Sequence, residues 1–106
     1  MENATLVILP VGDFTTAMAG KITAALGKAA ADGRAVVISW EWTTRFFWEA
    51  LCDLAEALRG PYRNVPVGFT SVPPTRRALL CELGLEPICL TESALPATAR
   101  RVLLWA

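Results

Sequence analysis

The chain has 106 residues, of which 54% are hydrophobic and 19% are charged. This length fits one compact domain over residues 1–106, and the apolar composition argues against intrinsic disorder. Ten basic and ten acidic side chains cancel to a net charge of zero. The sequence therefore lacks the positive field that binding to a nucleic-acid backbone requires.

Cysteine and histidine content gives no sign of a metal site. There is no histidine, and Cys52, Cys81 and Cys89 lack the C-x-x-C spacing of zinc sites. We expect no metal, no cofactor, and buried reduced thiols in a cytoplasmic protein. The apolar run Leu6–Leu9 is too short for a signal peptide, and no segment reaches the length of a membrane span.

The first part of the chain predicts two strands separated by a helix. Residues 5–11 form an apolar run that ends at Gly12–Asp13, typical of a strand followed by a turn. Residues 16–31 carry apolar side chains at helical intervals and end at Asp32–Gly33, where glycine suits the left-handed position after a helix. Residues 35–40 predict a strand that is apolar on both faces, as a central parallel strand requires.

The remaining chain continues the alternation. Thr43 or Thr44 is expected to cap a helix with an apolar stripe over 47–58. The segments that follow are a strand over 65–70, a helix from Pro73 to Leu83, a short strand over 87–90 and a helix over 94–104. This order predicts an α/β fold: a single, mostly parallel sheet of four to five strands with about four helices.

Three strand-and-turn motifs follow one another along the chain, and their order and spacing are informative. Val11–Thr15 is a strand end running into a turn, and Val36–Trp40 is a strand followed by the loop 41–45. Val67–Pro74 is a strand and proline turn, and the helix that follows ends at Gly84–Leu85. In this order and spacing the motifs resemble the STAS family (sulfate transporter and anti-sigma factor antagonist domains) over nearly the whole chain. The resemblance implies a non-catalytic protein-interaction module.

The sequence departs from the family at its phosphorylation motif. In family members that antagonise anti-sigma factors, a serine of an Asp-Ser-Ser-Gly motif at the start of the second helix is phosphorylated by the partner kinase. By spacing, Phe47–Ala50 takes that place and holds no hydroxyl. Thr43 and Thr44, just upstream, are the alternative phosphorylation sites, with helix capping as their competing role. Glu49 would place a fixed negative charge at the helix start, where the helix dipole favours it.

Residues 40–48 hold more aromatic area than one small core can accept. Phe47 opens the helical stripe and Trp40 continues the inward alternation of its strand, so both are predicted to be core residues. The remaining rings and their charged neighbours are predicted to bind a protein partner: Trp42, Arg45, Phe46, Trp48 and Glu49. Packing of these rings over the end of the sheet stays open as the alternative.

The nature of the partner is also left open. The favoured function is a regulatory module that binds a kinase-like anti-sigma factor, without the phosphorylation switch. One alternative is the STAS subunit of an ABC-type lipid transport complex, docked on the transporter ATPase. Others are a small-ligand domain for a nucleotide or lipid, and a homodimer. No enzyme is expected, because no nucleophile–base pair can be named and Asp13 alone suits a turn.

Overall fold

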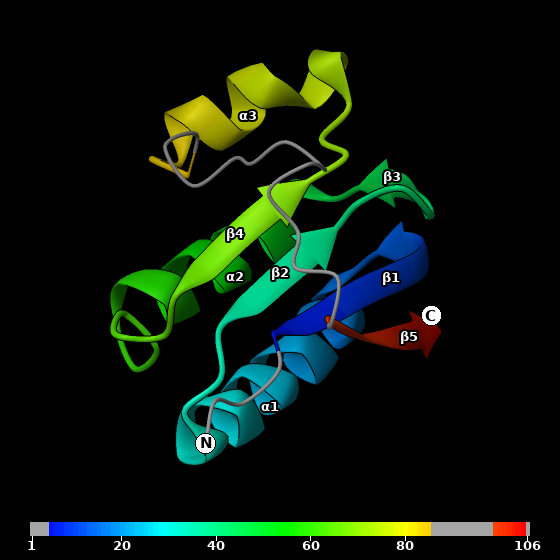
Figure 1. Ribbon diagram of the computed structural model, residues 1–106. Coiled ribbons are helices and arrows are strands. Elements are labelled where there is room, and N and C mark those ends of the chain that lie inside the picture. The colour runs from blue at the N-terminus through cyan, green and yellow to red at the C-terminus, as the bar shows by residue number, and fades with distance from the viewer. Residues whose placement is uncertain (1–4, 86–98, 106) are drawn as a thin grey trace.

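The computed structural model describes residues 5–85 and 99–105 and shows the predicted α/β fold, with one sheet of five parallel strands (Figure 1). The elements follow in this order: β1 (Leu6–Phe14), α1 (Thr16–Asp32), β2 (Val36–Ser39), β3 (Thr43–Phe46), α2 (Trp48–Arg59), β4 (Val67–Thr70), the 3-10 helix η1 (Pro74–Arg76), α3 (Arg77–Glu82) and β5 (Arg100–Trp105).

The central strand of the sheet is β1. It pairs with β5 along Leu6–Val11 and with β2 along Leu6–Ile8. Beyond its pairing with β2, strand β1 pairs with β3 along Gly12–Phe14. Strand β2 pairs on its other side with β4. Figure 1 shows α1 and α2 behind the sheet, on one face. The carboxyl ends of β1, β2 and β4 therefore meet at one edge, beside β3.

Helix α1 forms as its sequence predicts. The Thr15 hydroxyl oxygen accepts a hydrogen bond of 3.3 Å from the Met18 amide, which caps the first turn. Gly33 ends the helix in the left-handed conformation, with φ of 67°. The apolar stripe predicted from periodicity is buried and consists of Met18, Ile22, Leu26 and Ala29. Ala19 is buried beside it.

Helix α2 corrects one core prediction. Leu51 and Leu54 are fully buried, as the stripe predicted, but Phe47 is 43% exposed. Phe47 is the residue before the helix, with extended backbone at φ −92° and ψ 134°. Because it stands outside the helix, helical spacing does not set the direction of its side chain.

The region after α2 agrees with the prediction of a strand and a proline-opened helix. Pro74 begins η1, which runs into α3, and Gly84 follows with φ of 73°. The Arg59 guanidinium donates a hydrogen bond to the Leu83 carbonyl, which ties the end of α2 to the end of α3. Cys81 is exposed and Cys52 is half-buried, so neither of these free thiols has the buried position expected from the sequence.

Two predicted elements are wrong within the described residues. The final helix expected over 94–104 is, over Arg100–Trp105, the strand β5. The loop expected over 41–45 contains the start of β3, so Thr43 and Thr44 lie in a strand and cap no helix. Both strands exist because β1 offers them backbone partners from a distant part of the chain. The strand predicted over 87–90, Cys89 and the first part of that helix, 94–98, lie outside the described residues.

Four aromatic rings form the core near the carboxyl ends of the strands. Trp40 is 1% exposed, as predicted, and its ring centroid lies 5.0 Å from that of Phe14 and 5.4 Å from that of Phe69. Phe46 closes the group, 5.3 Å from Trp40. Edge-to-face packing of this kind adds to the stabilisation from burial alone. None of the described helices is long and apolar enough to cross a bilayer.

Candidate functional site

The junction between β1 and β3 positions the candidate site. The Gly12 amide donates a hydrogen bond of 3.1 Å to the Trp42 carbonyl, and Gly12 has φ of 97°, a conformation that glycine adopts without strain. The pairing register shifts between Gly12 and Phe14. This irregularity presents Asp13 to two consecutive residues of β3, Thr44 and Arg45.

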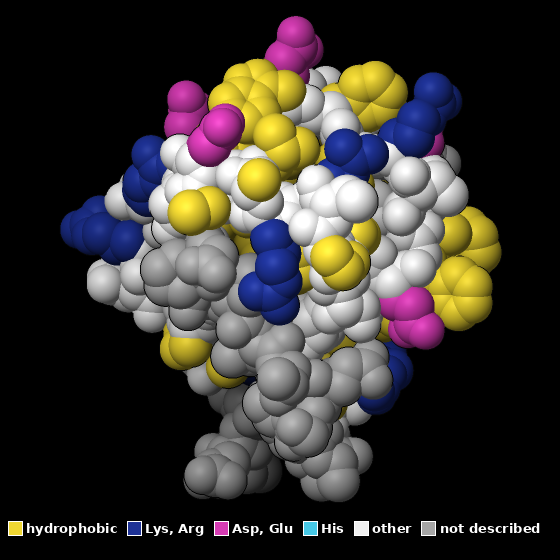
Figure 2. All heavy atoms as spheres, turned by 90° about the horizontal axis from the view of Figure 1, so that it is seen from above, with side chains coloured by type: hydrophobic (Ala, Val, Ile, Leu, Met, Phe, Trp, Pro, Cys, Tyr) yellow, Lys and Arg dark blue, Asp and Glu magenta, His cyan; other side chains and the backbone are white. Residues whose placement is uncertain are grey.

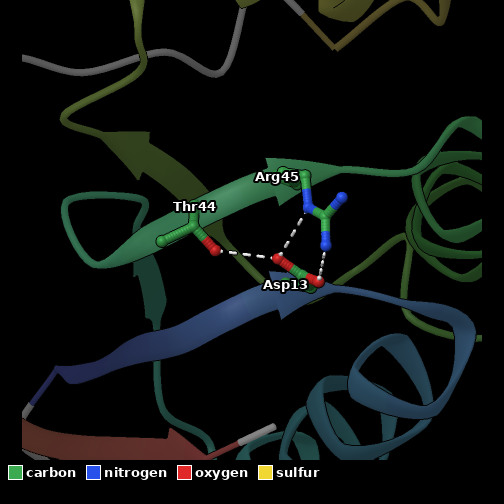
Figure 3. Close-up of polar contacts among 3 residues, drawn as sticks. All are labelled: Asp13, Thr44 and Arg45. Atoms are coloured by element: carbon green, nitrogen blue, oxygen red, sulfur yellow. Dashed lines mark hydrogen bonds and ion pairs between the residues drawn. The ribbon is translucent and has the colours of Figure 1, made fainter.

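Asp13, Thr44 and Arg45 form a polar cluster that links the two strands. The Thr44 hydroxyl donates to Asp13 Oδ1 at 2.9 Å. The Arg45 guanidinium donates from Nε to Oδ1 at 3.3 Å and from Nη2 to Oδ2 at 3.0 Å, which makes the ion pair bidentate. Figure 3 shows the carboxylate on β1 directed at both β3 side chains.

The electrostatics of this cluster favour an ionised Asp13. The hydrogen bonds from Arg45, and then from Thr44, lower the pKa of Asp13 below its ordinary value, and Asp13 raises the pKa of Arg45. A carboxylate with a lowered pKa is a weak proton acceptor at neutral pH. The cluster is therefore suited to holding Arg45 in place and poorly suited to proton transfer.

Large exposed rings flank β3 at both ends. Trp42, which precedes the strand, is 56% exposed, and Trp48, at the first position of α2, is 47% exposed. The Arg45 guanidinium carbon lies 5.8 Å from the centre of the exposed Phe47 ring, within cation–π range. We call these four residues, Trp42, Arg45, Phe47 and Trp48, the aromatic surface.

The structure places the residues predicted from the sequence in different environments. Trp42, Arg45, Trp48 and Glu49 are exposed around β3 and the first turn of α2, whereas Phe46 is half-buried and packs against Trp40. The Arg76 guanidinium carbon lies 5.7 Å from the centre of the Phe46 ring, within cation–π range. Phe46 therefore belongs to the rim of the core.

The two candidate phosphorylation sites already use their hydroxyl groups as donors. Thr43, which is half-buried, donates to the Pro10 carbonyl at 3.1 Å. Thr44 is exposed and donates to Asp13. Both bonds hold β3 against β1, a role that the sequence alone did not reveal.

Phe47 and Asp13 are the site residues that sequence reasoning missed. Helical spacing predicts Phe47 to be a core residue, and Asp13 by itself is typical of a turn. A signal for Asp13 is present in the sequence: Thr44 and Arg45 are polar residues within a run of aromatic ones. In a short exposed strand, such side chains can pair with a carboxylate on the neighbouring strand.

Neither a metal site nor a field of one charge marks this region. Within residues 5–85 and 99–105, no group of carboxylates and thiols could hold a metal ion. Figure 2, which views the molecule from above Figure 1, shows hydrophobic side chains interspersed with side chains of both charges. A hollow of about 260 Å³ lies elsewhere, between α1 and β5, and its lining includes Leu6, Lys28 and Arg100.

Comparison with known proteins identifies the fold. No family model matches the sequence, and no curated protein shows significant similarity to it. The chain is similar in structure to the STAS domain of a SulP transporter from Vibrio cholerae, with a TM-score of 0.56 and 13% sequence identity. The match covers 84% of this chain and 75% of that domain. The chain therefore has a STAS-like fold, as the order of its sequence motifs predicted.

Proposed function

We propose that this STAS-like domain is a non-catalytic module that binds a protein partner through the aromatic surface. The observation that carries the proposal is the exposure of three large rings, Trp42, Phe47 and Trp48, around one short strand. Tryptophan and arginine are the residues that most often dominate the binding energy of protein interfaces. Exposed rings that gather in one region mark a binding surface more often than scattered ones do.

Arg45 is already held in a defined conformation before any partner arrives. Its bidentate bond to Asp13 and its position over Phe47 restrict a side chain that would otherwise be mobile. Binding of a partner to Arg45 would therefore cost less side-chain entropy than binding to an unrestrained arginine, because the Arg45 side chain is already ordered. Because the guanidinium remains largely exposed, it stays accessible to an acidic or aromatic group of the partner.

The proposed module acts without a phosphorylation switch at the start of α2. The helix begins at Trp48, within the Phe47–Ala50 stretch that replaces the family's Asp-Ser-Ser-Gly motif. Glu49 supplies a negative charge in the first turn that no phosphatase can remove. We therefore propose that partner binding is constitutive, and that it is regulated by the availability of the partner.

Two classes of partner fit this proposal. A kinase-like anti-sigma factor is the partner implied by the sequence resemblance. A transporter component is the second candidate, because the structurally similar domain belongs to a SulP transporter. Which class binds decides whether the module regulates transcription or supports transport.

The test is capture of a partner with matched bait proteins. Wild type, Trp48→Glu and Phe47→Glu would be compared with Ala24→Glu, which adds the same charge at an exposed position of α1. Circular dichroism would first establish that all four baits are folded, and mass spectrometry would identify the retained proteins. We expect one protein to be retained by wild type and Ala24→Glu and lost by both variants of the aromatic surface.

The identity of the captured protein separates the partner classes. Co-purification of a kinase-like protein supports the regulatory function, and co-purification of a transporter or its ATPase supports the transport function. Equal retention of the same protein by Trp48→Glu and wild type would refute the role of the aromatic surface.

A further inference from the structure

Strand β5 exposes apolar side chains at a border of the sheet, away from β3. Leu103 is 51% exposed and Trp105 is 64% exposed, and both lie on the sheet face that carries their pairing partners Leu9 and Val11. Among the described residues β5 pairs with β1 alone, and Figure 1 shows it at the outer border. A border strand with exposed apolar side chains is a template for pairing with another strand.

The backbone groups available at this border are defined by the pairing with β1. The Arg100 amide donates a hydrogen bond of 2.8 Å to the Thr5 carbonyl, so Arg100 directs its backbone toward β1. Backbone groups alternate in direction along a strand, and side chains alternate between faces. Arg101, Leu103 and Trp105 therefore direct their amides and carbonyls outward and carry their side chains on one shared face.

We propose that β5 pairs with β5 of a second copy of this chain in an antiparallel, two-fold symmetric arrangement. In the register that uses all the outward-facing residues, Leu103 lies opposite Leu103 of the second copy. Arg101 then lies opposite Trp105 of the second copy, twice by symmetry. The two five-stranded sheets join into one continuous sheet.

The side chains favour this register over its neighbours. Leucine opposite leucine buries apolar surface, and arginine opposite tryptophan forms a cation–π pair. A register centred on Arg101 would instead place two like charges directly opposite each other, which is destabilising.

The Lys21 ammonium group donates a hydrogen bond of 2.6 Å to the Trp105 carbonyl and holds the end of β5 against α1. The second lone pair of that carbonyl oxygen remains available for the strand pair. Since the strand pair is short, we expect a dimer of micromolar affinity.

The first test measures self-association by sedimentation velocity over a range of concentrations. Trp105→Arg places two arginines opposite each other, so its dimer dissociation constant should rise at least about tenfold. Leu103→Lys is the second variant, in case the first does not fold. Ala78→Arg adds the same charge to the exposed surface of α3 and should dimerise like wild type.

The second test checks the register. In a variant without Cys52, Cys81 and Cys89, a cysteine at Leu103 should crosslink to its copy through a short bis-maleimide, since directly opposite Cα atoms lie about 5.5 Å apart. Glu82→Cys, exposed on α3, is the matched control and should stay uncrosslinked. A wild-type monomer at all concentrations, a dimer unaffected by Trp105→Arg and Leu103→Lys, or equal crosslinking by both cysteines would each overturn the proposal.

Discussion

The Thr43 hydroxyl donates a hydrogen bond of 3.1 Å to the Pro10 carbonyl, at the point where β1 changes from one neighbouring strand to another. Pairing with β2 ends at Ile8 and pairing with β3 begins at Gly12. Pro10, which has no amide hydrogen to donate, stands between these two pairings, at a point where no strand among the described residues pairs with that side of β1. The Thr43 hydroxyl therefore supplies the Pro10 carbonyl with a hydrogen-bond donor at a position between the β2 and β3 pairings.

Replacement of Thr43 tests this bond. Thr43→Val keeps the shape and β-branching of the side chain but removes the donor, so the free energy of unfolding should fall by about 1 kcal/mol. Thr43→Ser keeps a hydroxyl and should retain most of the bond. Urea denaturation monitored by tryptophan fluorescence would measure both; equal stability of Thr43→Val and wild type would show that the bond contributes nothing.

The Asp13 ion pair predicts a dependence on pH with a definite sign. Since the pKa of Asp13 is lowered in the folded protein, the pair stabilises the fold fully above the ordinary carboxyl pKa and loses that contribution as the pH falls through the lowered value. The stability difference between wild type and Asp13→Asn should therefore be constant above about pH 5 and shrink in more acidic solution.

The cause of the lowered pKa can be measured directly by NMR titration of the Asp13 carboxyl. Arg45→Ala should raise the pKa of Asp13 back toward its ordinary value of 3.8, and Thr44→Val should raise it less, because Arg45 has the larger effect. A larger rise in Thr44→Val than in Arg45→Ala would contradict the assigned causes.

Alanine substitutions at Gly20, within helix α1, and at Gly33, directly after it, should change the free energy of unfolding in opposite directions. Gly20 is an exposed helical residue whose added Cβ meets no atom within 4 Å, so Gly20→Ala should stabilise the protein by about 0.5–1 kcal/mol. Gly33 has φ of 67°, so Gly33→Ala should destabilise it by about 1–2 kcal/mol. Thermal and urea denaturation would check both, and a shift of the same sign for the two variants would be inconsistent with the helix end described above.

The aromatic residues Trp40 and Phe47, both predicted from the sequence to be core, should differ widely in their effect on stability. Trp40→Ala removes a fully buried ring in contact with Phe14 and Phe69 and should cost about 3–5 kcal/mol. Phe47→Ala removes an exposed ring and should change the free energy of unfolding by less than about 0.5 kcal/mol. Equal losses in a urea titration would place Phe47 in the core after all.

The elements that the sequence predicted well are those defined by local patterns. Helix α1 has an apolar stripe and a glycine directly after its last residue, and both predicted features are present in the structure. Strands β3 and β5 have no such local definition, since each is stabilised by pairing with β1 far away in the chain. The leucines of β5 fit a helix and a strand equally well until β1 supplies backbone partners.

The same limit explains which site residues could be predicted. The sequence predicts Trp42, Phe46 and Trp48 at the surface because they match no buried pattern. Trp42 and Trp48 are exposed, whereas Phe46 is half-buried. The partner of Arg45 could not be predicted, because a register shift in a strand pair brings Asp13 to it. Phe47 was misassigned because the helix begins one residue later than its stripe suggests.

The pairing of β1 with β5 also has a consequence for synthesis on the ribosome. Residues 6–11 are translated long before their partners, residues 100–105. Until then one side of the central strand keeps its backbone groups unpaired, so α1, β2 and β4 can assemble only an incomplete sheet. Such an intermediate with an open strand is prone to associate with other chains, and the nascent domain is therefore expected to depend on chaperones until its last strand is in place.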